Sequence, residues 1–418
     1  MKILWHYSVL NLGGAEISTV RLLNAFAARG HQVELVLNLP GGLAEPLLSP
    51  EVRVTHLRPR GVPRPGLGAL SRGGASWQQS ARKPASLIRR GGDLWRYGQD
   101  KWAEFCRIRQ RARAGDVDVG VVGLQGLSPR LVCEKVRPRR RIHFIRNTID
   151  RCDPSGQLAR RIAANSGNVD AYICVSDAAR DALLASVPQI ARRVHVVPNL
   201  LDAAAMRARA KEQDPFPTRT DRTRVLTVAR LSERAKGLHR MVRVHQALRA
   251  RGIDFDWYVL GDGDDRAPFE AAIKTAGLSD RMHLVGRHSN PYPFIAHADL
   301  VAVLSHYEGL SGAINEAKVL GRPVIATDVG GAREQLSGGG GLVVRSEDSA
   351  IVEGMAALLL DDQKRALLAK CPLPDHLLND EAKIDRLTSL FAEGLDPATS
   401  RRPTSHGSRA PTVLAGEG

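Results

Sequence analysis

The sequence predicts an α/β protein of two successive domains, each with a parallel sheet. The first observation is length, because 418 residues exceed what one ordinary hydrophobic core holds. The second is a repeated alternation of strand-like runs with amphipathic helical segments, which is typical of parallel sheets covered by helices. The third is a pause in this rhythm near residues 198–211. We therefore assign residues 1–205 to the first domain and 206–375 to the second.

A βαβ unit opens the first domain. Residues 2–10 are strand-like, residues 11–16 (NLGGAE) are typical of a loop, and residues 17–30 have the spacing of an amphipathic helix that ends at a glycine. A second strand-like run follows, and four more complete the domain, so that these runs occupy residues 31–39, 116–124, 141–147, 171–176 and 195–199.

After Pro40 the pattern fails, and a basic segment, residues 58–113, interrupts the first domain. Arginine and lysine alternate there with Trp77, Trp95 and Trp102, and we expect a loop followed by one or two basic helices. Two interpretations stay open. The segment would dock on an anionic lipid surface, or it would be a solvated, arginine-rich helical face.

The second domain repeats the βα pattern six times. Its strand-like runs occupy residues 224–231, 255–263, 282–288, 300–305, 323–331 and 341–344. Residues 376–395 carry a final helical pattern, which we expect to pack back on the first domain. Residues 396–418 have a disordered composition.

The net charge of +16 predicts an anionic partner, such as nucleic acid, an acidic membrane face or a phosphorylated substrate. The five cysteines are scattered and odd in number, which favours reduced thiols in the cytosol. No window approaches 18 apolar residues, so any membrane contact is expected to be peripheral.

Two acids, Glu308 and Glu316, stand eight residues apart in the mostly apolar stretch EGLSGAINE. Ser311 is a favoured N-cap residue, and Gly321 followed by Pro323 ends a helix, so a helix from about 312 to 320 is expected. Glu308 then lies in a loop and Glu316 about one turn into the helix.

The loop between the acids follows a parallel strand, where α/β sheets bind ligands. Backbone amides of Leu310, Ser311 and Gly312 would face a phosphate at the helix N-terminus. One acid would then hold sugar hydroxyls and the other ribose hydroxyls. Alternatively, Glu308 is a capping acid and Glu316 a solvated helix residue.

Other residues suit an anionic ligand. Arg230 follows a strand and Lys236 precedes a glycine that opens a helix, which fits a diphosphate but also fits a charged surface loop. Gly13 and Gly14 precede a helix and permit close approach to an anion, or they form a simple tight turn. They do not make the GxGxxG dinucleotide fingerprint.

In combination, these motifs closely resemble the retaining glycosyltransferases of family 4. The likeness is continuous from about residue 225 to 344, through VARL, KGL, YVLGDG, HLVGRH, EGLSGAINEAKVLGRPVIATDVGG and GGGGLVV. GGAE near the N-terminus, with ICVSDAARDAL and VHVVPN further on, supports it. The resemblance implies the GT-B architecture, in which two Rossmann-like domains face each other across a cleft.

The resemblance also implies transfer of a sugar from a nucleotide-diphosphate sugar, with no bound metal and no cofactor. The catalytic residues would be Glu308 on the donor sugar, with Arg230 and Lys236 on the diphosphate. Glu316 would bind the ribose. The implied donor-binding positions are Gly13, Gly14, Gly261, Gly286, Arg287, Gly309, Leu310, Ser311, Gly312 and Glu316.

One position departs from the family pattern. Relatives commonly carry a histidine after the strand at 141–147, whereas this chain has Arg146 followed by Asn147, and His143 is out of register. Arg146 and Asn147 would bind an acceptor carboxylate or phosphate, or stabilise the donor, or Arg146 would be a surface residue. The D-x-D pairs Asp116–Asp118 and Asp262–Asp264 are interpreted as loop and strand residues rather than a metal site.

We therefore expect an enzyme that extends a lipid-linked or cell-surface polysaccharide (lipopolysaccharide, capsule or exopolysaccharide). It would act in the cytoplasm, peripheral on the cytosolic face of the inner membrane, where the acidic lipid is the anionic partner. The sequence leaves its oligomeric state open. Two rivals are a nucleotide-sugar epimerase or hydrolase of the same fold, and a nucleic-acid-binding protein; the latter lacks a recognised binding motif.

Overall fold

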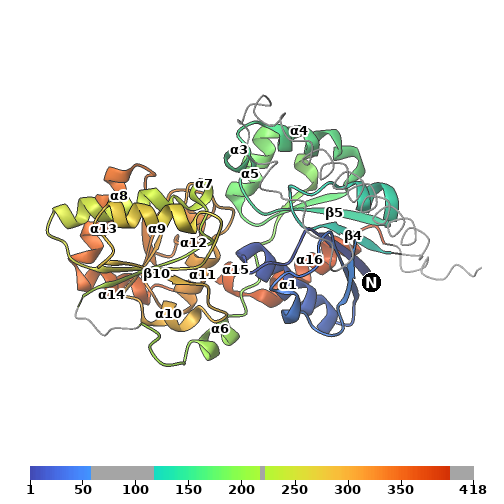
Figure 1. Ribbon diagram of the computed structural model, residues 1–418. Coiled ribbons are helices and arrows are strands. Elements are labelled where there is room, and N and C mark those ends of the chain that lie inside the picture. Colours follow the sequence, from blue (N-terminus) through green and yellow to red (C-terminus); the bar gives the residue numbers. More distant parts are fainter. Residues whose placement is uncertain (58–116, 217–221, 396–418) are drawn as a thin grey trace, which may run out of the picture.

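The structure is a computed structural model that describes residues 1–57, 117–216 and 222–395. Two α/β domains lie side by side, each around its own all-parallel sheet (Figure 1). The predicted fold class is therefore confirmed. The basic segment 58–113, Asp116 and the tail 396–418 lie outside the described residues, so the expectations for them stay predictions.

The first domain contains a seven-stranded sheet in the order β3-β2-β1-β4-β5-β6-β7. Its strands are β1 (Lys2–Tyr7), β2 (Gln32–Leu37), β3 (Arg53–His56), β4 (Val119–Val122), β5 (Arg140–Ile145), β6 (Ala171–Cys174) and β7 (Val194–Val196). Its helical elements are α1 (Gly14–Ala28), η1 (Glu45–Leu47), η3 (Leu131–Val136), α3 (Ile149–Cys152), α4 (Gln157–Ala164), η4 (Ser166–Asn168), α5 (Asp177–Ser186) and η5 (Pro188–Arg193).

Strand β3 corrects the expectation that the strand pattern fails after Pro40. It pairs in parallel with β2 at the edge of the sheet, with Arg53 opposite Glu34 and Thr55 opposite Val36. The Thr55 hydroxyl also donates to Glu34 across the pair, at 2.8 Å. Four residues of mixed polarity give no clear periodicity, because an edge strand packs against only one neighbour.

The second domain contains a six-stranded sheet in the order β10-β9-β8-β11-β12-β13. Its strands are β8 (Arg224–Val228), β9 (Asp256–Leu260), β10 (Met282–Gly286), β11 (Leu300–Val303), β12 (Val324–Thr327) and β13 (Gly341–Val344). Its helices are α6 (Ala203–Arg209), α7 (Glu233–Lys236), α8 (Leu238–Ala250), α9 (Arg266–Thr275), α10 (Tyr292–His297), α11 (Gly312–Val319), α12 (Ala332–Gln335), α13 (Asp348–Leu359), α14 (Asp362–Lys370) and α15 (Asp375–Leu378).

Successive residues of the central strands pack against opposite layers of helices, as the two-residue period of a strand requires. In β9, Trp257 and Val259 join the cluster of α8, α9 and α13. Tyr258 and Leu260 join the cluster of α6, α10 and α11 on the other face. Both faces are therefore buried, which explains the nearly continuous apolar character of these strands.

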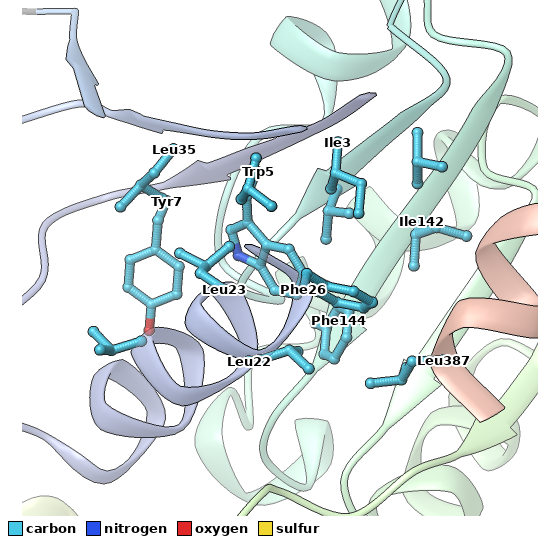
Figure 2. Packing of buried hydrophobic residues seen from close by; sticks show 14 of the residues in the cluster. Ile3, Trp5, Tyr7, Leu22, Leu23, Phe26, Leu35, Ile142, Phe144 and Leu387 are labelled. Atoms are coloured by element: carbon cyan, nitrogen blue, oxygen red, sulfur yellow. The ribbon is translucent and has the colours of Figure 1, made fainter. Parts of the chain in front are cut away.

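The last helix, α16 (Asp380–Ala392), leaves the second domain and packs against the first. Its Phe391 stacks on Phe26 of α1, with ring centroids 5.2 Å apart. Leu387 points into the same core as Trp5 and Phe144 (Figure 2). The two domains are thus tied together at the C-terminal end of the described chain as well as by the segment before α6.

We predict that Phe391→Ala lowers the free energy of unfolding by about 3–5 kcal/mol, because it removes a fully buried ring. Urea denaturation followed by circular dichroism measures this. The matched control is Leu367→Ala on α14, whose side chain is 64% exposed and whose loss should change the value by less than about 0.5 kcal/mol. If both variants behaved alike, α16 would not be a stabilising part of the first domain.

Candidate active site

The loops after β8 and β11, two adjacent strands at the centre of the second sheet, bring the predicted cation and acid together. Lys236 ends α7, which follows β8, and Glu308 lies in the loop after β11. Their side chains form an ion pair with 2.5 Å between Lys236 Nζ and Glu308 Oε1. A small pocket is lined by both residues, with Thr227, Ser305 and Ser311.

Glu308 is held firmly in this loop. The Ser305 hydroxyl donates to the same Oε1 at 2.7 Å, and Thr148 of the first domain donates to the Glu308 carbonyl oxygen at 3.4 Å. The Glu308 side chain is only 13% exposed and that of Lys236 21%, so water screens the pair less than a surface ion pair. The sequence predicted both residues for the site but not that they pair with each other.

Arg230, the second predicted cation, is exposed just beyond the end of β8. Its charge acts on Glu16, a residue of α1 in the first domain. Burial raises the pKa of the Glu16 carboxyl, and the charges of Arg230 and Arg146 lower it. Glu16 is thus an acid of the site that sequence reasoning missed, although it ends the string GGAE that carried part of the family resemblance.

Gly13 and Gly14 lie at the N-terminus of α1, in the same turn as Glu16. Gly13 is the N-cap residue of α1, and no side chain caps the helix there. A Cβ at position 13 would lie 2.4 Å from Glu16 Oε2, so the acid folds back over the helix N-terminus. The absence of a side chain at Gly13 makes room for this carboxylate, which the helix N-terminus attracts.

Glu316 lies in α11 and has a different environment from Glu308. Its side chain is partly buried, and burial raises the pKa of its carboxyl to about 7, whereas the charge of Arg21 on α1 lowers it. The alternative that Glu316 is a solvated helix residue is therefore wrong. The site holds one acid paired with a lysine and a second acid poised to change protonation near neutral pH.

The N-terminus of α11 differs from the expectation in one respect. Ser311 is the N-cap residue, but its hydroxyl makes no cap hydrogen bond. Its amide donates to Gln335 Oε1 at 3.0 Å, and Gln335 Nε2 donates back to the Ser311 carbonyl at 2.7 Å. The prediction that the Ser311 amide faces a phosphate is therefore wrong, because a buried side chain already satisfies it. For Leu310 and Gly312 it stays a prediction.

Gly309 is a point of close contact between the two domains. A Cβ there would lie 2.0 Å from the carbonyl oxygen of Arg146. The Gly309 carbonyl accepts from the Ser176 hydroxyl of the first domain and from the Gly331 amide of the second, both at 2.9 Å. The loop that carries Glu308 therefore lies directly against the carboxyl edge of the first sheet.

Arg146 is a buried residue, only 5% exposed, so the alternative of a surface arginine is wrong. Its guanidinium donates to the carbonyl of Gly123 at 3.0 Å and to Asn199 Oδ1 at 3.1 Å, and it lies over the ring of Phe144. Its backbone abuts Gly309 together with that of Asn147. Contact with an acceptor stays a prediction for both residues.

The remaining predicted positions lie at the edge of β9 and β10. Gly261 follows β9, and its amide donates to the carbonyl of Gly286, the last residue of β10, at 2.7 Å. A Cβ at Gly261 would lie 1.8 Å from the Ala229 carbonyl, which explains the glycine. Arg287 follows Gly286 and is exposed. In the sheet, β9 and β10 lie beyond β8 from β11, whose following loop carries Glu308.

Within residues 1–57, 117–216 and 222–395, no three His, Cys, Asp or Glu side chains gather closely enough to hold a metal ion. Asp118 accepts from the Lys2 amide at 2.8 Å, and Asp262 from the Gly263 amide at 2.9 Å. His143 is buried, with its pKa lowered to about 4 by burial. In the same part of the chain, no helix has the length and apolar character needed to cross a bilayer.

Two protein-family models match this chain. The model of Glycosyltransferase Family 4 matches residues 12–205, and the model of Glycosyl transferases group 1 matches residues 208–370. The chain belongs to the family 4, group 1 glycosyltransferases. The resemblance inferred from the motifs is therefore confirmed, and the two models divide the chain between its two domains.

Individual relatives in this glycosyltransferase family are distant. Alpha-D-kanosaminyltransferase of Streptomyces kanamyceticus is 29% identical over 254 residues, 58% of this chain and 64% of that protein. The lipopolysaccharide core biosynthesis mannosyltransferase LpsB of Rhizobium meliloti is 34% identical over 124 residues, 27% of this chain and 35% of LpsB. The chain thus spans less than two thirds of the length of these curated relatives.

A solved structure shares the whole architecture. Anabaena Alr3699/HepE aligns with 94% of this chain and 99% of its own, with a TM-score of 0.70 and 19% sequence identity. At that identity the likeness shows the fold alone. The two-domain arrangement described above is therefore the GT-B fold.

We predict that Glu316→Gln stabilises the ligand-free protein above pH 7. Folding raises the carboxyl pKa from 4.5 to about 7, so between these values the native state keeps a proton that the unfolded chain releases, and stability falls as pH rises. The variant should gain about 2 kcal/mol over the wild type at pH 8 and much less at pH 5. Thermal melts at both pH values measure this, and an equal gain at both would contradict it.

Proposed function

We propose that the protein moves a sugar from a nucleotide-diphosphate sugar to a glycan acceptor, with retention and without a bound metal. The observation that carries this is the Lys236–Glu308 ion pair, which lies at the carboxyl ends of β8 and β11 beside the contact with the first domain. Family membership supports it, and so do the complexes of Alr3699/HepE with UDP and with UDP-glucose.

In this proposal, Arg230 and Lys236 stabilise the leaving nucleoside diphosphate. Negative charge develops on the phosphates as the glycosidic bond breaks, and fixed cations at the site lower the barrier. Arg230 offers a planar fork and Lys236 a compact charge. Lys236 would keep its ion pair with Glu308 when the donor binds. Both contacts of the Glu308 carboxylate described above are made by Oε1, so Oε2 would accept a hydrogen bond from a hydroxyl of the donor sugar.

The state of Glu308 argues against a covalent intermediate between the enzyme and the sugar. A carboxylate already paired with Lys236 and Ser305 is a weak nucleophile, so it suits binding better than covalent attack. We infer that the acceptor hydroxyl attacks on the face that the diphosphate leaves. The new glycosidic bond forms, the bond between the sugar and the phosphate oxygen breaks, and the acceptor proton passes to that phosphate.

The proposed acceptor is a lipid-linked or cell-surface polysaccharide, elongated at the cytosolic face of the inner membrane. The similarity to LpsB, a mannosyltransferase of lipopolysaccharide core biosynthesis, supports this class. The net charge of +16 supports it as well, because it favours anionic acceptors and an anionic membrane surface. A small soluble acceptor is the second candidate, favoured by the longer match to the kanosaminyltransferase.

A donor screen tests the proposal. We expect at least one nucleotide-diphosphate sugar to raise the melting temperature of the wild type, and we expect Glu316→Gln to lose that response, since the ribose hydroxyls lose a charged acceptor. Thermal-shift assays with a panel of donor bases and sugars measure it. If no donor stabilised the wild type, the assignment would fail, and donor turnover to an epimer or free sugar without acceptor would favour the epimerase or hydrolase.

Lys236→Ala should lower kcat by about 100- to 1,000-fold with the fold intact, because the leaving group loses a fixed cation. Steady-state assays with the donor from the screen measure this, and circular dichroism checks the fold. Lys274→Ala is the matched control, because Lys274 is an exposed lysine of α9. Near-normal turnover of Lys236→Ala would remove Lys236 from the site.

A further inference from the structure

Two helices of the first domain, α3 and α5, lie against the loop that carries Glu308. They pack side by side through Ile149, Ala179 and Leu183, which belong to one buried apolar cluster (Figure 1). Helix α3 follows β5 and α5 follows β6, so both helices begin at the carboxyl edge of the first sheet. Their first residues therefore reach the domain contact as one packed unit.

Each of these helices donates a hydrogen bond to the loop after β11. The hydroxyl of Ser176, the N-cap residue of α5, donates to the carbonyl of Gly309 at 2.9 Å. The hydroxyl of Thr148, the N-cap residue of α3, donates to the carbonyl of Glu308 at 3.4 Å. Ser176 is 0% exposed and Thr148 6%, so water does not readily replace either bond. Two consecutive carbonyls of the loop are thus tied to the first domain.

The second domain supports the same peptide from another side. A Cβ at Gly330 would lie 2.4 Å from the Glu308 carbonyl oxygen, and the Gly331 amide donates to the Gly309 carbonyl at 2.9 Å. The peptide that joins Glu308 to Gly309 therefore lies between the turn after β12 and the first domain. Loss of the first-domain hydroxyls would free one side of this peptide.

Helices α3 and α5 also contact the neighbouring loops. The carbonyl of Cys152 on α3 accepts from Arg234 Nη2 at 2.8 Å, and Arg234 lies in α7, two residues before Lys236. The amide of Asp177 on α5 donates to Glu334 Oε2 of α12 at 3.1 Å. The first domain thus contacts the segments after β8, β11 and β12, which are adjacent strands of the second sheet.

We propose that Ser176 and Thr148 are positioning residues: from the first domain, their hydroxyls hold the loop after β11 so that the Glu308 carboxylate meets the donor sugar. This rests on the proposed function, in which Glu308 binds that sugar. Glu308 then reaches its working position only while the two domains are in contact. The dependence matters for the rate, because a misplacement of about 1 Å in a site costs about 100-fold.

The test variants are Thr148→Val and Ser176→Ala. Thr148 makes no cap hydrogen bond, and valine keeps its shape, so only the hydroxyl is lost. Ser176 also accepts from the Ala179 amide at 3.2 Å, so Ser176→Ala removes a helix cap as well. Asp361→Ala is the matched control for the cap, because Asp361 accepts from the Lys364 amide at 2.8 Å at the start of α14.

Steady-state assays with the donor from the screen give the first readout. Ser176→Ala should lower kcat about tenfold and Thr148→Val about threefold, with KM for the donor changed by less than about twofold, since alignment acts mainly in the transition state. Thr148→Ser and Asp361→Ala should keep the wild-type kcat. In a Glu308→Gln background, Ser176→Ala should change kcat by less than about twofold, because it acts through Glu308. An equal loss of kcat in both backgrounds would overturn the positioning role.

A second readout needs no donor. Hydrogen exchange of residues 308–312, followed by mass spectrometry, reports how firmly the loop is held. Exchange there should be faster in Ser176→Ala and Thr148→Val than in the wild type, and unchanged in Asp361→Ala. Unchanged exchange in the first two variants would also overturn the proposal. Failure of the wild type to use any donor would instead refute the proposed function, and the exchange would still test the hold of the first domain on this loop.

Discussion

The site depends on the close backbone contact at Gly309. No side chain fits between this residue and the carbonyl of Arg146, and the carbonyl of Gly309 is fixed from both domains, by Ser176 and by Gly331. The loop that carries Glu308 is therefore set against the carboxyl edge of the first sheet. Because both sheets present their carboxyl edges here, residues of either domain reach the same ligand.

This placement gives two similar acids different chemistry. Glu308 lies beside Lys236 and keeps a partner, whereas Glu316, one helical turn into α11, is partly buried, and burial raises the pKa of its carboxyl to about 7. A buried, partly protonated acid costs stability, and such costs are typical of sites kept for function. Burial raises the pKa of Glu316 because it removes water from the carboxylate, and hydrogen bonds from a bound ribose would offset that desolvation cost.

The sequence predicted the fold class, and it predicted that Glu308 lies in a loop and Glu316 in the following helix, because those signals are local. Capping and stop residues defined α11 to within one residue, and motif spacing brought Lys236 to the correct edge of the sheet. Contacts between distant segments were not readable. Gln335 satisfies the Ser311 amide from 24 residues away, and Arg21 reaches Tyr292 across 271 residues, so neither leaves a periodic signal. Strand β3 escaped prediction for another reason, since four half-polar edge residues carry too little pattern.

The central claim is that one nucleotide diphosphate binds across the Gly309 contact, with its phosphates on the cations and its ribose on Glu316. A crystal structure with a bound nucleoside diphosphate tests this most directly. The account predicts phosphate oxygens within hydrogen-bond distance of Arg230 and Lys236, and ribose hydroxyls on the Glu316 carboxylate. A nucleotide whose phosphates contacted neither cation, or whose ribose lay away from Glu316, would contradict it.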